Sequence, residues 1–135
     1  MKPHLTLIAR QGQAAELDWA GLVPEATRRR LACDCVLSDI KLDPEGTVLN
    51  TGRARRTIPP SLRRTLVARD QGCRWPGCDR PWRWTDGHDL WHWEDGGPNS
   101  LANTVLLCRR HHRKLHEGGW ALVWAPGGDL VARPP

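Results

Sequence analysis

The sequence predicts an α+β chain in which an N-terminal extension precedes a small, zinc-stabilised module of two strands and a helix. Two observations lead to this class. Strand-like and helix-like stretches alternate along the chain, with turn signals between them. Cysteine, histidine and tryptophan then gather between residues 73 and 120, as in modules too small for an ordinary core. We therefore expect the extension to cover 1–60 and the module 61–135.

The extension is expected to contain a strand, a helix, a hairpin and a basic connector. Residues 3–9 alternate polar and apolar side chains as a strand does, and 10–23 look like a loop. A helix is predicted over 24–37, because it opens with a proline suited to a first helical position. The turn signal DPEG predicts a hairpin over 38–50, and the basic stretch 51–60 connects it to the module.

The module is expected to open with a helix over 61–72 that turns its leucines inward and its arginines outward. The residues concerned are Leu62, Leu66, Arg63, Arg64 and Arg69. The remaining predicted elements are a strand at 85–93, a loop at 94–100, a strand at 101–108, a helix at 109–119 and a closing hairpin at 120–132.

Composition favours some partners and excludes others. No apolar run approaches the roughly 18 residues of a membrane span, and the N-terminus has no stretch typical of a signal peptide, so we expect a cytoplasmic protein without a membrane partner. The net charge is +5 and most basic residues are arginine, whose guanidinium fits phosphate and base edges. This favours a nucleic-acid partner over a small-molecule substrate; the alternative is that an arginine-rich genome yields arginine-rich surfaces.

The cysteines predict a zinc site. Five cysteines in a chain without a secretion signal argue against a disulfide framework. Cys73 and Cys78 are separated by four residues around a Pro-Gly turn, and Cys108 and His111 by two, which suits a tetrahedral site of three thiolates and one imidazole. The alternative is a set of ordinary buried thiols. Cys33 and Cys35 are interpreted as such core residues.

The run CRRHHRKLH also predicts a second metal site. Side chains four apart share a helix face, so His112 and His116 point together while His111 points elsewhere. His88 on the preceding strand is the obvious third ligand. Three protein ligands with an open position describe a catalytic site, and a hairpin with one histidine followed by a helix with two is a ββα-metal arrangement.

The stretch from Cys73 to Trp120 resembles an HNH (His-Me finger) endonuclease module. The motif is GC-x4-C, GH, DGGP and N-x4-C-x2-HH-x3-H, and the likeness extends upstream from Cys33. It is closest to the bacterial family in which a C-terminal HNH module follows a helical domain of unknown function, and we expect the chain to begin near the end of that domain. The resemblance implies metal-dependent hydrolysis of DNA phosphodiester bonds.

The resemblance also implies roles for individual residues. A catalytic divalent cation such as Mg²⁺, Mn²⁺ or Zn²⁺ is expected at His88, His112 and His116, and structural Zn²⁺ at the Cys73, Cys78, Cys108 and His111 group. Asn103 is expected to fix the loop that links the strands and the geometry around the catalytic base; without the motif it could equally be a simple turn asparagine. A basic helix surface is expected to contact DNA, although it could equally be a solvated face; its members are Arg109, Arg110, Arg113 and Lys114.

The sequence departs from the family at the general base, because Asp89 stands where a second histidine is expected. An aspartate with an ordinary pKa near 4 is a poor base at neutral pH, which predicts an impaired enzyme. Alternatively, Asp89 joins the ion and a register slip makes His88 the base. His92 is a third candidate, but along an extended strand it would lie roughly 13 Å from His88, too far for the same water unless the strand is strongly bent. His92 is therefore interpreted as a structural or phosphate-facing residue.

Three hypotheses follow. The chain is an HNH endonuclease, a zinc-stabilised nucleic-acid-binding module that has lost cleavage through Asp89, or a remnant with neither activity. The tryptophans around the motif are interpreted as core rather than as surfaces for stacking on bases.

Overall fold

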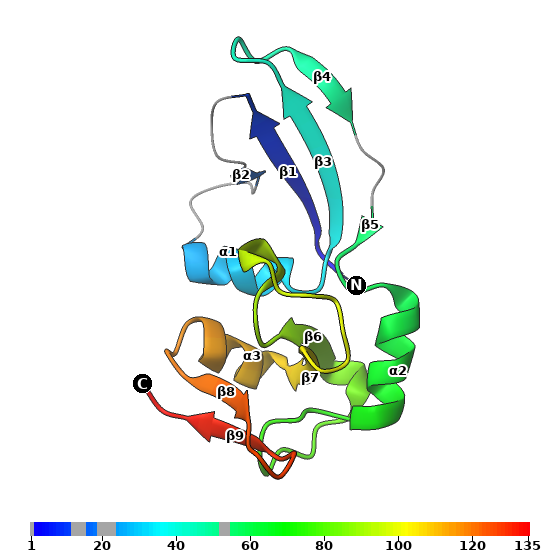
Figure 1. Cartoon of the computed structure of the whole chain (residues 1–135), viewed down its shortest axis with the longest axis vertical. Helices are drawn as coiled ribbons and strands as arrows, with labels where there is room; N and C mark the ends of the chain where they lie inside the picture. The colour runs from blue at the N-terminus through cyan, green and yellow to red at the C-terminus, as the bar shows by residue number, and fades with distance from the viewer. Residues whose placement is uncertain (1, 12–15, 19–23, 52–54) are drawn as a thin grey trace. The chain divides into compact units, whose positions relative to one another are not determined.

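The computed structural model covers residues 1–135 and describes all of them except 1, 12–15, 19–23 and 52–54 (Figure 1). The chain divides into two compact units, Met1–Thr57 and Ile58–Pro135. Short helices and small sheets make it an α+β chain. Within the described part of the chain, no helix is long and apolar enough to cross a membrane.

The first unit is a sheet with one helix. Its elements are β1 (His4–Arg10), β2 (Glu16–Asp18), α1 (Glu25–Ala32), β3 (Val36–Leu42), β4 (Val48–Thr51) and β5 (Arg55–Arg56). β1 and β3 run parallel because α1 provides the crossover between them, and β2 pairs with β1 from the other side. β3 then turns back into β4 through the predicted DPEG turn.

Three predictions for this unit were wrong. The stretch expected to be a loop contains β2, the helix expected to reach residue 37 ends at Ala32, and the expected connector contains β5. The helix gives way because Leu37 is needed in the sheet, where it pairs with Leu5 and both side chains are buried. Such long-range pairing overrides local helix propensity. Part of the connector lies outside the described residues.

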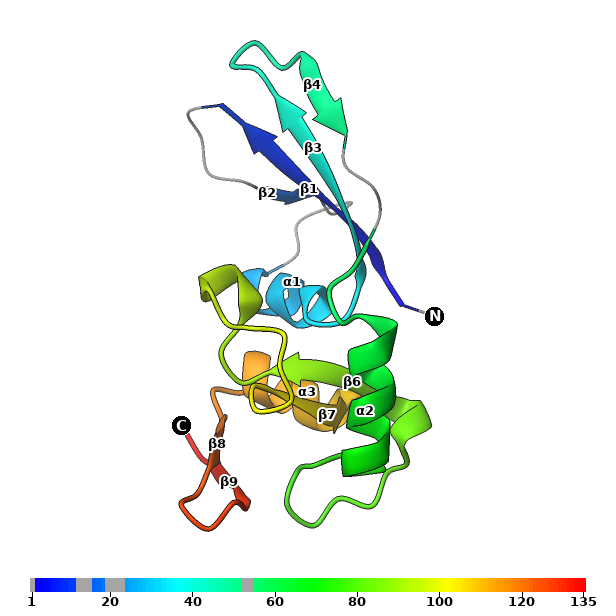
Figure 2. The same cartoon turned by 45° about the vertical axis from the view of Figure 1, so that its right-hand side comes forward.

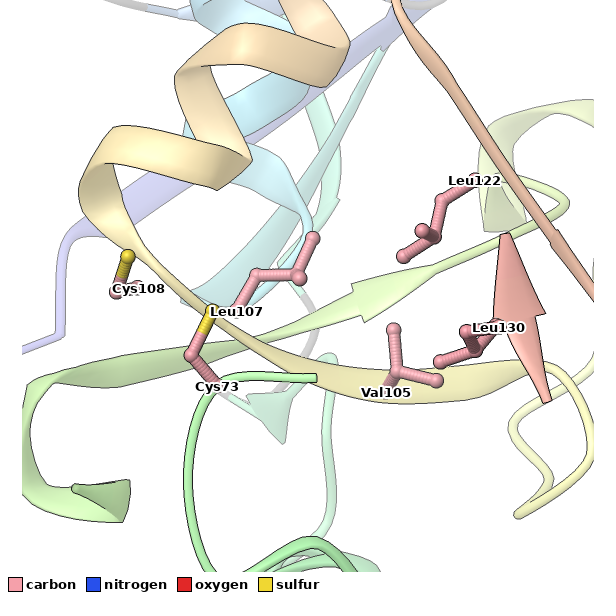
Figure 3. Packing of buried hydrophobic residues seen from close by; sticks show 6 residues of the cluster. All are labelled: Cys73, Val105, Leu107, Cys108, Leu122 and Leu130. Atoms are coloured by element: carbon pink, nitrogen blue, oxygen red, sulfur yellow. The ribbon is translucent and has the colours of Figure 1, made fainter. Parts of the chain in front are cut away.

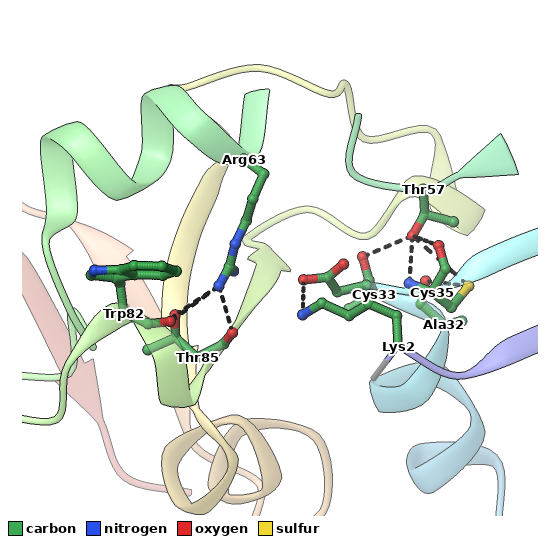
Figure 4. Close-up of polar contacts among 9 residues, drawn as sticks. Lys2, Ala32, Cys33, Cys35, Thr57, Arg63, Trp82 and Thr85 are labelled. Carbon is green, nitrogen blue, oxygen red and sulfur yellow. Dashed lines mark hydrogen bonds and ion pairs between the residues drawn. The ribbon is translucent and has the colours of Figure 1, made fainter. Parts of the chain in front are cut away.

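Polar bonds fix the segment between α1 and β3 (Figure 4). The Thr57 hydroxyl donates to the backbone carbonyl of Cys33 at 3.2 Å and accepts from the backbone N–H of Cys35 at 3.0 Å. Both cysteines are fully buried. Lys2 forms an ion pair of 2.8 Å with the buried carboxylate of Asp34, which ties the start of the chain to the same segment.

The second unit contains the cysteine- and histidine-rich stretch (Figure 2). Its elements are α2 (Pro60–Asp70), the 3-10 turns η1 (Trp82–Trp84) and η2 (Trp93–Asp95), β6 (Thr85–Asp89), β7 (Thr104–Cys108), α3 (Arg109–His116), β8 (Ala121–Trp124) and β9 (Leu130–Arg133). β6 and β7 pair antiparallel, and α3 follows β7 without a linker. β8 and β9 form the predicted closing hairpin.

β7 is the centre of the second unit because it is buried on both faces. Val105 and Leu107 pack with Leu122 and Leu130 of the closing hairpin, together with two cysteines (Figure 3). On the opposite face Leu106 packs against α2. The alternation of side chains along a strand therefore joins the hairpin and the helix through one five-residue element.

One further expectation for this unit was wrong. The strand predicted over 85–93 ends at Asp89, after which the chain turns. Two of the arginines expected to point outward also bind the backbone, Arg69 as an exposed residue and Arg63 as a partly exposed one. Arg63 donates to the carbonyl oxygens of η1 and β6, and Arg69 donates to the carbonyl of Thr104 at 2.6 Å. Leu66 is buried as predicted.

Candidate metal centres

Three cysteines and one histidine converge on the loop after α2 and the start of α3. Sγ of Cys73 and Sγ of Cys108 lie 3.5 and 3.4 Å from Nδ1 of His111. Cys78 completes the group, in which all four ligand atoms lie within 4.8 Å of one another. A group of this chemistry and size can hold one metal ion with four ligands.

The loop geometry explains why these residues meet. The backbone N–H of Cys73 donates to the carbonyl of Arg80 at 2.9 Å, which closes the loop that carries Cys78. Gly72 permits this closure, since a Cβ there would lie 2.4 Å from the Arg80 carbonyl oxygen. Gly77 adopts a left-handed φ of 80° in the turn between the two thiols.

Aromatic rings support the imidazole of His111. The ring of Trp75 stacks on it with a centroid distance of 4.7 Å and an interplanar angle of 5°. The ammonium of Lys114 lies 4.0 Å from the ring centroid of Trp120 and 5.1 Å from that of Trp75. These contacts fix the orientation of one ligand and use Lys114, expected to bind DNA, in packing.

The protonation of Cys73 and His111 affects how this group can bind a metal ion. Burial raises the pKa of the Cys73 thiol to about 12. Burial, followed by the charges of Arg110, Lys114 and Arg80, lowers the pKa of His111. An ion binding here must therefore displace the proton of Cys73, whereas the imidazole is available as a neutral ligand.

Three other histidines form a second group on the other face of α3. The ring centroids of His88, His112 and His116 are separated by 4.9 to 5.1 Å, which makes a nearly equilateral triangle. Their ligand atoms lie within 4.8 Å of one another. His88 comes from β6 and the others from successive turns of α3, as the helical period predicts.

The second group is also prepared for a cation. Burial, helped by His116 and His92, lowers the pKa of His88 to about 3. This imidazole is therefore neutral at pH 7, which is the form that binds metals. Within the second unit the triangle offers an ion three imidazoles, whereas the cysteine-containing group offers it four ligands.

Asp89 lies apart from this triangle. Its Oδ1 accepts a hydrogen bond from the hydroxyl of Thr104, its partner across the β6–β7 pair, at 3.2 Å. Both side chains are buried. Because adjacent strand residues point to opposite faces, Asp89 and His88 diverge. Asp89 is not among the grouped side chains in the part of the chain that the structure describes.

His92 lies closer to the triangle than the sequence suggested. The chain turns after Asp89, so the ring of His92, itself buried, comes to 6.1 Å from that of His116. The estimate of roughly 13 Å from His88 assumed a straight strand and does not apply. The backbone N–H of Glu94 donates to Nδ1 of His92 at 3.2 Å, so the neutral ring carries its proton on Nε2.

Asn103 is the residue that makes the chain turn. Its side-chain oxygen accepts from the backbone N–H of Trp91, and its amide donates to the carbonyls of Trp91 and Pro98, each at 2.9 Å. Glycine at position 97 lets the backbone there lie close to that of Trp91, because a Cβ at this position would collide with the Trp91 carbonyl oxygen. The expected loop-fixing position of Asn103 therefore has a visible physical basis.

The basic residues of α3 divide by environment. Arg109, Arg110 and Arg113 are exposed, and Arg113 lies 3.8 Å from Glu117. Arg110 and Lys114 also line a cavity of about 450 Å³ beside the cysteine-containing group, together with Arg80. This concentration of positive charge suits an anionic partner.

Comparisons with known proteins find a family match that covers most of the first unit and continues through α2 of the second. Residues 4–70 match the model of a domain of unknown function (DUF222). The uncharacterized protein Rv3776 of Mycobacterium tuberculosis is 39% identical over 68 residues, which cover 50% of this chain and 13% of that protein. The uncharacterized protein Rv1128c of the same species is 31% identical over 90 residues, covering 67% and 20%. The chain thus spans a fifth or less of these relatives.

No solved structure matches the chain significantly. The fold and the candidate sites together define an α+β chain with cysteine and histidine groups that could hold metal ions. Its N-terminal half is similar to a domain of unknown function.

Proposed function

We propose that the second unit is an HNH endonuclease module of the ββα-metal type, which hydrolyses DNA phosphodiester bonds with little sequence preference. The observation that carries the proposal is the triangle of His88, His112 and His116, set on a strand and a helix next to a separate cysteine-containing group. The match of residues 4–70 to a domain of unknown function agrees with the domain order of the bacterial family that the sequence resembles.

The two groups are proposed to hold different ions. Three thiols and an imidazole favour structural zinc, because soft sulfur ligands select it. The imidazole triangle fits a divalent cation with an open position. Bound there, a cation such as Mg²⁺, Mn²⁺ or Zn²⁺ would act as a Lewis acid on the scissile phosphate and stabilise the leaving 3′ oxygen.

The protein's own groups are proposed to position the substrate around that ion. Arg109, Arg110 and Arg113 would hold the DNA backbone through their exposed guanidinium groups. His92, with its proton on Nε2, is a hydrogen-bond donor at that atom rather than a base. Asn103 would keep the loop after β6 in place while DNA enters.

Activation of the attacking water is the weak step. The carboxylate of Asp89 occupies the position of the expected base, and its Oδ1 accepts a hydrogen bond from the hydroxyl of Thr104. We therefore propose that cleavage is slow relative to an enzyme with histidine at this position. General-base catalysis contributes about 10²- to 10⁴-fold to a rate, which sets the scale of the impairment.

A second candidate function is DNA binding without cleavage, in the cytoplasm and without a membrane partner. The same position of Asp89 favours it, because a module can keep both metal groups and its basic helix after losing the base.

Plasmid nicking tests these proposals. The natural chain, Asp89→His and His116→Ala are compared with magnesium or manganese. Slow nicking by the natural chain, accelerated by Asp89→His and abolished by His116→Ala, is expected. Nicking only after Asp89→His would favour the binding module. If no variant nicks, the nuclease proposal fails, and if none binds DNA at low salt, both proposals fail.

A further inference from the structure

Two tryptophans on either side of β6 remain exposed, contrary to the interpretation of the tryptophans as core. The exposed fraction is 65% for Trp84, directly before the strand, and 56% for Trp91, just after it. A soluble unit of this size has no packing reason to expose two indoles beside one strand. His88, a member of the histidine triangle, lies on the strand between them.

The backbone that carries Trp84 is held firmly although its indole is exposed. One guanidinium nitrogen of Arg63 donates to the carbonyl oxygens of Trp82 and Thr85, at 3.1 and 2.9 Å (Figure 4). The hydroxyl of Thr85 donates to the Trp82 carbonyl at 2.6 Å, and the backbone N–H of Trp84 donates to that of Pro81 at 3.0 Å. The backbone that carries the exposed indole is therefore held in place by hydrogen bonds.

The backbone of Trp91 is likewise held in place by hydrogen bonds, here from Asn103. Asn103 binds both its backbone N–H and its carbonyl, and one edge of its ring packs over Gly96. The positions before and after β6 thus combine a rigid backbone with an exposed aromatic face. A rigid platform binds a flat partner at lower entropic cost than a flexible one.

We infer that Trp84 and Trp91 stack on unpaired bases, and that the substrate class is DNA with a single-stranded stretch at the cut site. The inference rests on the proposed nuclease or DNA-binding function. The two tryptophans flank β6, whose five residues span roughly 17 Å, and His88 lies on that strand. Bases paired inside a duplex expose no face for stacking, whereas every unpaired base does.

Charge supports a nucleic-acid strand as the occupant, more strongly at Trp84 than at Trp91. Arg83 lies between the tryptophans of η1 with its guanidinium 5.7 Å from the Trp82 ring centroid, and its charge remains available to a phosphate. Exposed Glu94 and Asp95 follow Trp91 and repel phosphates. The contribution of Trp84 is therefore the larger.

The test measures binding of a short fluorescein-labelled oligothymidylate, and of the same strand annealed to its complement, with no magnesium or manganese added. Trp84→Leu is expected to weaken binding of the single strand about tenfold, the scale of one stacked base, and binding of the duplex far less. Trp84→Phe retains an aromatic face and is expected to bind nearly as the natural chain does. Both changes are on an exposed side chain, so both variants should fold.

Trp124→Leu is the matched control, because Trp124 is 36% exposed but lies on the closing hairpin, with its indole N–H bound to Ala102. Equal binding of the single strand by Trp84→Leu and the natural chain would overturn the inference, as would equal losses for both DNA forms. Cleavage is scored separately by nicking. If the natural chain nicks DNA and Trp84→Leu binds the single strand as tightly as the natural chain does, only this inference is refuted. If Trp84→Leu loses single-strand binding and the natural chain nicks no DNA, only the nuclease proposal is refuted.

Discussion

The two candidate metal groups draw on the same nine-residue run yet differ in nearly every physical property. The cysteine-containing group provides four ligands, of which one imidazole is clamped by Trp75. The histidine triangle provides three imidazoles, from β6 and α3. Within the second unit, the first group thus offers an ion four ligands and the triangle offers it three. Adjacent His111 and His112 serve different groups because neighbouring helix residues point about 100° apart.

This difference teaches how a small unit separates stability from chemistry. The thiol group joins the loop after α2 to β7 and α3, and two of its cysteines belong to the core cluster. In the triangle His88 and His112 are buried, whereas His116 is only partly buried. We therefore expect damage to the first group to unfold the second unit, and removal of His116 to leave it folded.

The largest expected effect is that of Cys108→Ser. It removes a fully buried ligand, and structural zinc contributes about 10–16 kcal/mol in zinc-finger peptides, comparable with the whole stability of a domain. We expect Ile58–Pro135 to unfold, as seen by loss of dispersion in its NMR spectrum. Cys35→Ser is the matched control in the other unit. A Cys108→Ser variant that melts like the natural chain would remove the structural role of this group.

His116→Ala tests the opposite side of the comparison. Its side chain is only partly buried, so the second unit should keep its fold. Loss of one of three ligands should weaken ion binding at the triangle by more than the roughly 10- to 100-fold cost of losing an outer-shell partner. Isothermal titration with manganese measures this affinity, and thermal melting provides the check on folding. Unfolding would show that the triangle, too, is structural.

The pH dependence of metal binding should also separate the groups. The raised pKa of Cys73, about 12, means that its proton opposes binding at neutral pH, so affinity should rise up to about tenfold per pH unit for this thiol. The pKa of His88 is lowered to about 3, so no proton of this residue competes above that pH. Competition titrations between pH 7.5 and 9 should show a rising zinc affinity for the thiol group only. Parallel slopes would contradict the assignment.

The smallest expected effect is that of Trp75→Leu. It removes the ring that stacks on His111 and that lies under the ammonium of Lys114. Such aromatic contacts stabilise the folded state by about 0.5–1.5 kcal/mol beyond the effect of buried area. The melting temperature of the second unit should fall by a few degrees while manganese binding at the triangle stays unchanged. A change at the triangle without a change in melting would reverse the roles of the two groups.

Part of the membership of the two groups could be predicted because it depends on local geometry. Ligand pairs such as Cys108 and His111 sit within one turn of each other, and the helical period assigns His112 and His116 to another face. The α+β class followed from the alternation of short elements for the same reason.

The position of His92 and the exposure of Trp84 and Trp91 could not be predicted in this way. They depend on Asn103 and Arg63, which bind backbone atoms 12 to 22 residues away and so end β6 where no local signal marks it. The glycine at 97 was a usable signal, since DGGP allows a close backbone approach there. Composition shows that tryptophan is abundant but not which indoles face solvent.

Cobalt substitution tests the central claim, two metal groups of different ligand chemistry, most directly. Cobalt bound to thiolates gives intense charge-transfer absorption in the near ultraviolet, whereas cobalt bound only to imidazole and water does not. We predict that His116→Ala keeps the thiolate band and loses one bound cobalt, and that Cys78→Ser, which removes one of three thiolates, weakens the band. A thiolate band that disappears in His116→Ala, or cobalt binding without such a band in the natural chain, would contradict two separate groups.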